Sequence, residues 1–159
     1  MKTDLELMND KDSQVRYEVA KRIDIEHLPK MMNDESWDVR QEVAKRIDPK
    51  YLPMMMNDED NWVRLEVVKR IGSEGGAFAI EHLPKMMNDE NHSVRFYVVK
   101  RIGKEHLPKM MNDKSYYVRW EVAKRIDPKF LGEMFGLNFD PEYQKGLIRV
   151  LAEREDLKK

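Results

Sequence analysis

The chain has 159 residues, 37% of them charged, and its 29 lysines and arginines nearly balance 30 aspartates and glutamates, which leaves a net charge of −1. This balance disfavours nucleic acid as a partner of the whole chain, because nucleic-acid binders carry an excess of basic residues. The sequence contains no cysteine, which excludes disulfides, thiol catalysis, thiolate zinc sites and cysteine-ligated clusters. No apolar run approaches the ~20 residues of a membrane span, and the N-terminal MKTDLELMND lacks the apolar core of a signal peptide, so we expect a soluble, cytoplasmic protein.

A Val-Arg dipeptide recurs with spacings of 24, 24, 31 and 24 residues, at Val15-Arg16, Val39-Arg40, Val63-Arg64, Val94-Arg95 and Val118-Arg119. A fixed period of this length is typical of a protein that stacks its repeats into a solenoid. Each unit of such a protein is stabilised chiefly by its neighbours. We therefore expect most of the repeated residues to serve packing, and the residues that differ between copies to carry any specific function.

The chain begins partway through a repeat, because LELMND at residues 5–10 matches the end of the later KMMND segments. We expect this truncated repeat to act as an N-terminal cap. A helix is predicted in every later copy, and a residue that can cap its first turn stands three positions before each valine, at Asp12, Ser36, Asp60, Asn91 and Ser115. Each helix is expected to end at an isoleucine followed by Asp or Gly, after about three turns; in the second repeat it covers about residues 37–47.

A second, shorter element follows each helix. It reads HLPKMMND from His27 to Asp34, and its counterparts begin at Tyr51, His82 and His106. The internal proline keeps the preceding leucine out of helical geometry, so we predict a 3₁₀ turn or a helix of one or two turns. A second long helix does not fit, because repeats with paired long helices need about 40 residues.

The period is interrupted once and then ends. Residues 73–79 form an insertion, which we expect to be a surface loop, with a binding loop or a hinge as the alternative. The period fails after Leu131, so we predict a solenoid domain over 1–131 and a capping segment over 132–159. A helix is predicted from Asp140-Pro141 onward, with an apolar stripe of Tyr143, Leu147, Val150 and Leu151 that would cover the end of the solenoid.

The repeated pattern LPKMMNDEsxxVRxEVAKRIDp, over about residues 4–131, resembles the leucine-rich repeat variant family and, more broadly, HEAT-like α-solenoid repeats. The resemblance implies α-helices alternating with 3₁₀ helices in a right-handed superhelix. We therefore expect an all-α, right-handed α-solenoid of about five 24-residue repeats with a C-terminal capping helix. The best-known members of this family carry a cysteine-bound iron–sulfur cluster, which cannot be carried over to a chain without cysteine, so no cofactor is expected.

The arginine of each Val-Arg dipeptide lies on the buried arc of its predicted helix, about 100° from the valine. A buried charge must be paired, and the aspartate of each MND segment is the acidic residue that recurs as strictly. We predict a structural ladder in which these aspartates pair with arginines of their own or adjacent repeats: Asp34, Arg40, Asp58, Arg64, Asp89, Arg95, Asp113 and Arg119. The alternative is an arginine row that binds an anion such as phosphate.

Three further sets of repeated residues have a packing interpretation. Arg46 and Glu42, four positions apart, are expected to offset each other's charge, as are their counterparts. The paired methionines are interpreted as core, with a Met-rich binding groove as the alternative. A column of stacked rings is expected at the equivalent positions His27, Tyr51, His82, His106 and Phe130, in preference to a metal site.

The positions that differ between copies fall outside the buried arc and carry aromatic residues beside the lysine row. Exposed aromatic side chains are typical of surfaces that bind proteins or peptides. The alternative is that several of them pack between neighbouring helices. The candidate partner-binding residues are Tyr17, Trp37, Gln41, Trp62, Phe96, Tyr116, Tyr117, Trp120, Lys45 and Lys100.

These patterns favour a non-catalytic repeat scaffold that binds a protein or peptide. No nucleophile stands with a base, and neither a phosphate loop nor a catalytic carboxylate pair is recognisable, so we assign no catalytic residue and no metal ligand. Two alternatives stay open: a HEAT-like module that binds nucleic acid through its repeated Lys-Arg pairs, and a repeat subunit associated with an enzyme. Exposed aromatic residues are compatible with a monomer or a weak dimer.

Overall fold

The computed structural model describes residues 2–136 and 140–157. Part of the expected capping segment 132–159 and the first residue of the expected domain 1–131 therefore lie outside the described residues. The described residues form α-helices and 3₁₀ helices, without a strand among them, so the prediction of an all-α chain is confirmed. None of the described helices is long and apolar enough to cross a membrane.

The chain divides into two compact units, Met1–Glu74 and Gly75–Lys159. The division falls within the insertion at 73–79. The boundary that the sequence favours between residues 131 and 132 stays a prediction.

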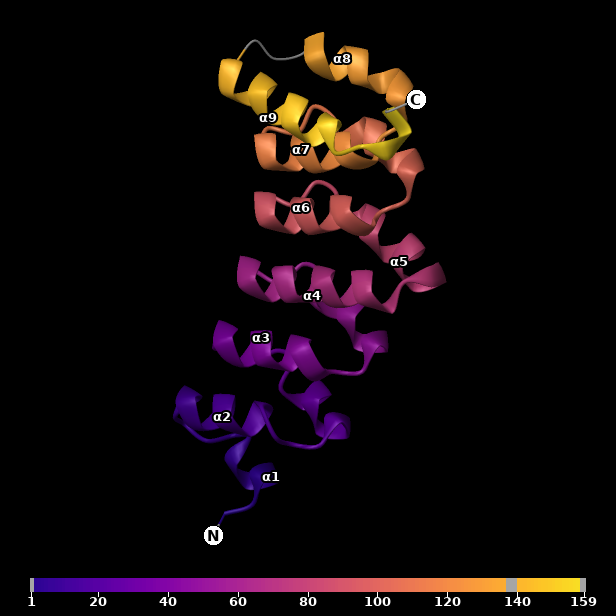
Figure 1. The fold of residues 1–159 in the computed structure, drawn as a ribbon. Helices are drawn as coiled ribbons and strands as arrows, with labels where there is room; N and C mark the ends of the chain where they lie inside the picture. The colour runs from indigo at the N-terminus through magenta and orange to yellow at the C-terminus, as the bar shows by residue number, and fades with distance from the viewer. Residues whose placement is uncertain (1, 137–139, 158–159) are drawn as a thin grey trace. The chain divides into compact units, whose positions relative to one another are not determined.

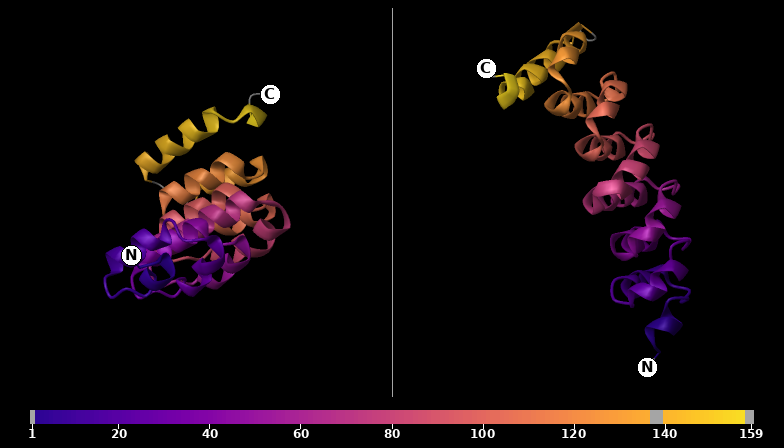
Figure 2. Two further views of the ribbon diagram at one scale, coloured as in Figure 1. Left: turned by 90° about the horizontal axis from the view of Figure 1, so that it is seen from below. Right: turned by 90° about the vertical axis from the view of Figure 1, so that its right-hand side faces the viewer.

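The first unit is a stack of short helices in which each α-helix packs on the next one along the chain. Figures 1 and 2 show α2, α3 and α4 lying side by side, with the 3₁₀ elements along one side of the stack. Its elements are α1 (Asp4–Leu7), α2 (Ser13–Ala20), η1 (Ile25–Lys30), α3 (Trp37–Arg46), η2 (Pro49–Met55) and α4 (Asn61–Glu74).

The second unit repeats this arrangement and ends in a longer helix. In it α6 packs on α7, and α7 packs on α9 (Figure 1). Its elements are α5 (Gly76–His82), η3 (Leu83–Met86), α6 (His92–Arg101), η4 (Lys104–Met110), α7 (Tyr116–Arg125), η5 (Pro128–Phe130), α8 (Leu131–Gly136), α9 (Pro141–Ala152) and η6 (Glu155–Leu157).

The predicted capping residues stand at the helix starts, but they do not all cap in the same way. The side chains of Asp12, Asp60 and Asn91 accept hydrogen bonds from backbone N–H groups of the first turn, at 2.8–2.9 Å. Ser36 and Ser115 occupy the N-cap position without a side-chain capping bond. The hydroxyl of Ser36 instead donates to Asp38, so the prediction of a serine cap is wrong at these two positions.

The short second elements are 3₁₀ helices, as the prolines within them predict. Their leucines and at least one methionine of each run are buried in the core, together with valines and isoleucines of the long helices. The buried apolar residues include Leu28, Met31, Val39, Val43, Ile47, Leu52, Met55, Leu83, Met86, Leu107 and Met110. Met54 departs from the predicted core role, because 66% of it is exposed.

The insertion is helical, which corrects the expectation of a surface loop. Ser73 and Glu74 extend α4, and α5 begins directly after Gly75. Gly75 stands between the two helices, and Gly75 and Gly76 have φ angles of 66° and 51°, which favour glycine. Residues 77–82 read AFAIEH and contain good helix formers, so the segment continues as a helix once the glycines have broken α4.

The C-terminal helix α9 covers α7, and it reproduces two features of a repeat helix. Of the expected apolar stripe of α9, Tyr143 and Leu147 are buried, while Val150 and Leu151 are half-buried. Asp140 caps its first turn through Glu142 N–H at 3.0 Å. Just past its last turn, Arg154 donates to the backbone carbonyls of Ala123 and Ile126, at 2.9 and 2.8 Å, where α7 ends.

Candidate functional site

The arginines and aspartates of the expected ladder lie beside each other within each unit. The guanidinium of Arg16 binds Asp34 through two parallel hydrogen bonds of 2.7 and 2.8 Å. A third bond, of 2.8 Å, runs from Arg16 to the backbone carbonyl of Asp10. Arg16 therefore joins its own repeat, through a carbonyl, to the aspartate of the next repeat.

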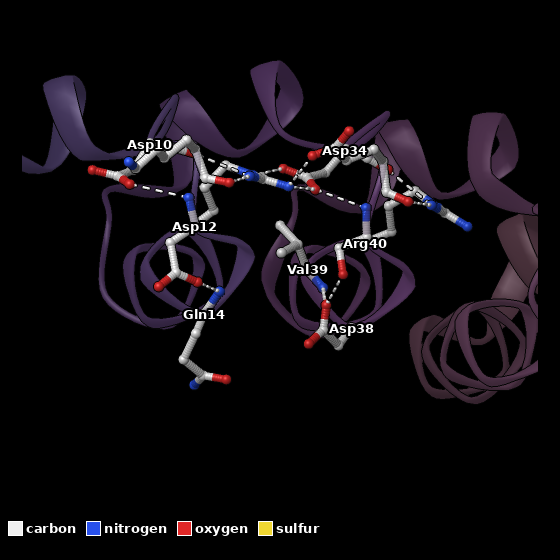
Figure 3. A network of polar contacts seen from close by, with 11 residues as sticks. Asp10, Asp12, Gln14, Asp34, Asp38, Val39 and Arg40 are labelled. Carbon is white, nitrogen blue, oxygen red and sulfur yellow. Dashed lines mark hydrogen bonds and ion pairs between the residues drawn. The ribbon is translucent and has the colours of Figure 1, made fainter.

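The same geometry recurs further along the chain. Arg40 binds Asp58 at 2.8 and 2.9 Å, and Arg95 binds Asp113 at 2.6 and 2.8 Å. Figure 3 shows Asp10 and Asp34 in one row, with Arg40 beside Asp34, whose carbonyl it contacts at 2.8 Å. Arg64 donates to the carbonyls of Asp58 and Glu59. The next aspartate of the expected ladder, Asp89, belongs to the second unit.

The last arginine of the row has a different partner. Arg119 donates to the carbonyl of Asp113 at 2.6 Å, but its guanidinium lies over the ring of Tyr143, 4.4 Å from the ring centre. Its buried Nε has no hydrogen-bond partner. An aromatic ring of the capping helix thus takes the place that an aspartate occupies in the earlier repeats, and a cation over a ring face retains part of the electrostatic attraction.

The ladder shifts the ionisation of its members in the direction that pairing requires. Burial raises the pKa of Asp34, but hydrogen bonds from Arg16 and from the Ser36 N–H outweigh burial, so this pKa lies below its usual value. The hydrogen bond to Asp34 raises the pKa of Arg16 above its usual value. The paired guanidiniums direct their donors to carboxylates and carbonyls, which does not favour the alternative of an anion-binding arginine row.

In the Lys-Arg pairs at the helix ends, the arginine and the lysine contact different groups, which corrects the expectation that the arginine pairs with the glutamate four positions before it. Arg46 does not pair with Glu42; it donates to the carbonyls of Ala20 and Ile23, where α2 ends. Arg70 and Arg125 contact helix-end carbonyls of the preceding repeat in the same way. A cation at a helix C-terminus satisfies unpaired carbonyls and opposes the negative end of the helix dipole.

The lysines of these Lys-Arg pairs form the ion pairs with the glutamates instead. Lys21, Lys45, Lys69 and Lys124 each lie within 2.8–3.5 Å of a glutamate three positions earlier, at Glu18, Glu42, Glu66 and Glu121. Lys100 is the exception, because Tyr97 occupies the glutamate position. The ammonium of Lys100 lies 5.6 Å from the ring centre of Phe96 and 5.5 Å from that of Tyr97.

The candidate partner-binding residues of the first unit are exposed to different degrees. Trp37 and Trp62, in the first turns of α3 and α4, are 46% and 52% exposed. Tyr17 and Gln41 are half-buried, and Lys45 is exposed. The first unit therefore offers two tryptophans at helix starts rather than a continuous aromatic surface.

Trp120 has a packing role. Its indole ring stacks on Tyr143 with ring centres 6.5 Å apart, and its N–H donates to the Tyr143 carbonyl at 3.2 Å. The approach is so close that a Cβ on Gly146 would overlap the indole ring. Because α9 covers one face of this side chain, Trp120 is better explained by the packing alternative than by partner binding.

The remaining aromatic residues of the second unit surround a depression between α6 and α7, here named the aromatic groove and defined by His92, Phe96, Tyr97, Tyr116 and Tyr117. The rings of His92 in α6 and Tyr117 in α7 are stacked, with ring centres 6.4 Å apart, and the ring centres of Tyr116 and Tyr117 are 4.2 Å apart. The groove has an open part of about 410 Å³ at the helix starts and a smaller part of about 240 Å³ beside Phe96. Tyr116 and Tyr117 are 41% and 50% exposed.

Sequence reasoning did not include two residues of this groove among the site residues. His92 stands at a position that differs between copies, and Tyr97 interrupts the glutamate row. The irregularity at each position was the available signal. Their proximity to Tyr116 and Tyr117 could not be inferred, because it depends on the contact of α6 with α7.

The predicted ring column does not form within either unit. His82 is buried against Phe78 with ring centres 4.5 Å apart, while Tyr51 and Phe130 lie beneath the ammonium groups of Lys50 and Lys129. In the second unit no described ring contact joins His82, His106 and Phe130. The described parts of the chain hold no group of three or more His, Asp or Glu side chains placed to bind a metal.

Comparison with solved structures first gives the class of protein. A structure described as a leucine-rich repeat variant with a novel repetitive structural motif superposes with a TM-score of 0.69 and 31% identity, over 91% of this chain and 69% of that one. An engineered protein matches with a TM-score of 0.51 and 18% identity over 94% of each chain, a likeness of fold alone. The fold is an all-α repeat solenoid, as predicted.

The first of these matches also gives the family. At 31% identity over this coverage, the chain belongs to the leucine-rich repeat variant family, which confirms the resemblance seen in the repeated sequence pattern. No family model and no curated protein matches the chain.

Proposed function

We propose that this protein is a non-catalytic repeat scaffold that binds a peptide segment of a partner protein in the aromatic groove of its second unit. The observation that carries the proposal is the groove itself. Five ring-bearing side chains from two adjacent helices surround an open depression, and two of the tyrosines there are close to half exposed. Tyrosine supplies a large contact area with little loss of conformational freedom, so it is common in binding hot spots.

The contrast with the repeated residues supports this assignment. The ladder, the helix-end arginines and the lysine–glutamate pairs recur from copy to copy and stabilise the stack. The groove residues do not recur: the first repeat has Ser13 and Tyr17 where the fourth has His92 and Phe96. Packing between identical neighbours calls for identical residues, so the variation favours a role outside the stack.

A nucleic-acid partner is less well supported. The lysines of these Lys-Arg pairs are largely neutralised by their glutamate partners, and the arginines already direct N–H donors to helix-end carbonyls, so neither set is free to contact phosphates. Binding to a phosphate backbone depends on cations that are not already engaged by other groups of the protein. We therefore place the partner among proteins.

The test begins with capture from native lysate and ends with a purified partner. Proteins retained by the wild type are identified, expressed and titrated against it by calorimetry. The variant His92→Ala/Tyr117→Ala should weaken binding of a true partner about 10-fold or more, the size expected for a hot spot. Met54→Ala is the matched control, since it also removes an exposed apolar side chain, from a 66% exposed site in the other unit.

Circular dichroism must first show that the variants are as helical as the wild type. If the partner binds the groove variant with unchanged affinity, the proposed site is wrong. Should Trp37→Ala/Trp62→Ala abolish binding instead, the partner site lies on the first unit.

A further inference from the structure

Every lysine at the end of a repeat helix has a glutamate partner, apart from Lys100. The four regular pairs have nitrogen–oxygen distances of 2.8–3.5 Å, and in each the glutamate stands three residues before the lysine. In α6 this position holds Tyr97, and Lys100 makes no ion pair with any described residue. A positive charge that the other repeats neutralise is thus left exposed in one copy.

This charge lies at the rim of the aromatic groove. The Lys100 ammonium is 5.6 Å from the ring centre of Phe96 and 5.5 Å from that of Tyr97, and both rings line the smaller part of the groove. The other side chains lining that part are His92, Ser93 and Tyr117, so no acidic residue borders it. A ligand in this part of the groove meets aromatic surface and one uncompensated cation.

The charges around the larger part of the groove do not cancel the positive charge of Lys100. Its charged residues are Glu90, Arg95 and Lys114, and Arg95 is already bound to Asp113. Glu90 and Lys114 carry opposite charges at its border. The groove as a whole therefore presents a net positive rim around an apolar floor.

Resting on the proposed function, we infer that the aromatic groove selects an acidic-aromatic peptide segment: an aromatic or large aliphatic side chain with an Asp or Glu directly beside it. The apolar group lies against Phe96 and Tyr117, and the carboxylate pairs with Lys100. Complementary charge of this kind sets partner preference and register more than total affinity.

The test uses three synthetic peptides and the full chain labelled with ¹⁵N. The probes are Ac-Gly-Asp-Trp-Asp-Gly-NH₂, its Lys-Trp-Lys analogue and its Asp-Ala-Asp analogue, each titrated to about 2 mM, where a single anchor residue is expected to bind. The acidic tryptophan peptide should shift the amide signals of His92, Phe96, Tyr97 and Tyr117. It should bind about 5-fold more tightly than the basic peptide, and the alanine peptide should cause no shift.

Three lysine variants isolate the role of the Lys100 charge. Lys100→Gln should reduce affinity for the acidic tryptophan peptide about 3-fold, the size of one exposed ion pair, and Lys100→Arg, which keeps the charge, should bind as the wild type does. Lys21→Gln is the matched control, because Lys21 occupies the same repeat position but is paired with Glu18. It should leave affinity unchanged.

Each contrary result has a distinct meaning. Equal shifts from the acidic and basic tryptophan peptides overturn the charge preference and leave the groove as a binding site. An absence of shifts from all three peptides overturns both this inference and the proposed function. If the groove signals shift with protein concentration in the absence of peptide, the groove binds a second copy of the chain, and the inference is overturned. If oligo-dT causes equal, salt-sensitive shifts at Lys45 and Lys100, these lysines bind nucleic acid, and the inference is likewise overturned.

Discussion

The arginine–aspartate ladder shows how a repeat protein accommodates charge in its interior. Arg40 is only 6% exposed, and the Asp58 side chain 8%. Removing such charges from water costs several kcal/mol per ion, which is offset only where the pair is well aligned and its other donors are satisfied. Both conditions hold here, since Arg40 makes two bonds to one carboxylate and further bonds to carbonyls.

Truncating one partner of a ladder pair should therefore be costly. Arg40→Met is expected to lower the free energy of unfolding by about 3 kcal/mol, because it leaves the Asp58 carboxylate buried without its cation. The double variant Arg40→Met/Asp58→Leu should lose less than the sum of the two single variants. Urea unfolding followed by circular dichroism measures these values. Strictly additive losses would show that the pair contributes no coupling.

The lowered pKa of Asp34 predicts how stability depends on pH. Its pKa in the folded chain lies below that in the unfolded chain, so its contribution is fully present above about pH 4 and is lost as the pH falls through the folded-state pKa. The melting temperature of the wild type should drop between about pH 4 and pH 2 more steeply than that of Asp34→Asn. If the two melting curves respond equally to pH, Asp34 does not contribute in this way.

At the scale of the elements, the capping helix α9 acts as a substitute repeat. Arg154 contacts the carbonyls at the end of α7 as Arg46 contacts those at the end of α2, and Tyr143 takes the place of the missing ladder aspartate beneath Arg119. The cap thereby satisfies groups that the next repeat would have satisfied. A solenoid needs such a terminal unit to cover its exposed end.

Gly146 makes this docking possible, and its replacement should disrupt it. A Cβ there would overlap the indole ring of Trp120, which is fixed by its own stacking and hydrogen bond, so Gly146→Ala should destabilise the second unit by about 1–3 kcal/mol. Gly132→Ala is the control, since no atom lies within 4 Å of the corresponding Cβ. Thermal unfolding and tryptophan fluorescence report the effect. Equal stability of the two variants would contradict this view of α9.

The helices and 3₁₀ elements could be predicted because their signals are local: capping residues, prolines and apolar spacing recur in every copy. Arg40 could be placed in the interior from its angular position alone. The partner of Arg46 could not be inferred, because a helical wheel shows neighbours within one helix, whereas this arginine contacts backbone carbonyls of another repeat, which leave no mark in the sequence. Trp120 looked like a surface residue for the same reason, since the helix that covers it comes from outside the repeat pattern.

At the scale of the molecule, the contacts favour stability that is distributed along the chain. Helices pack chiefly on their neighbours in sequence, and the chain divides at Gly75 into two compact units. In a protein of this kind, stability is close to a sum of repeat and nearest-neighbour terms, and local openings need not spread through the whole chain.

A substitution that destabilises one unit should therefore increase local unfolding mainly within that unit. In hydrogen exchange, Arg40→Met is expected to accelerate exchange most in α3 and its neighbours α2 and α4, and much less in α7, which makes its contacts within the other unit. Gly146→Ala should give the converse pattern, with α7 and α9 most affected. Because each variant serves as the other's control, uniform acceleration over residues 2–136 in both would mean that the chain unfolds as one cooperative body.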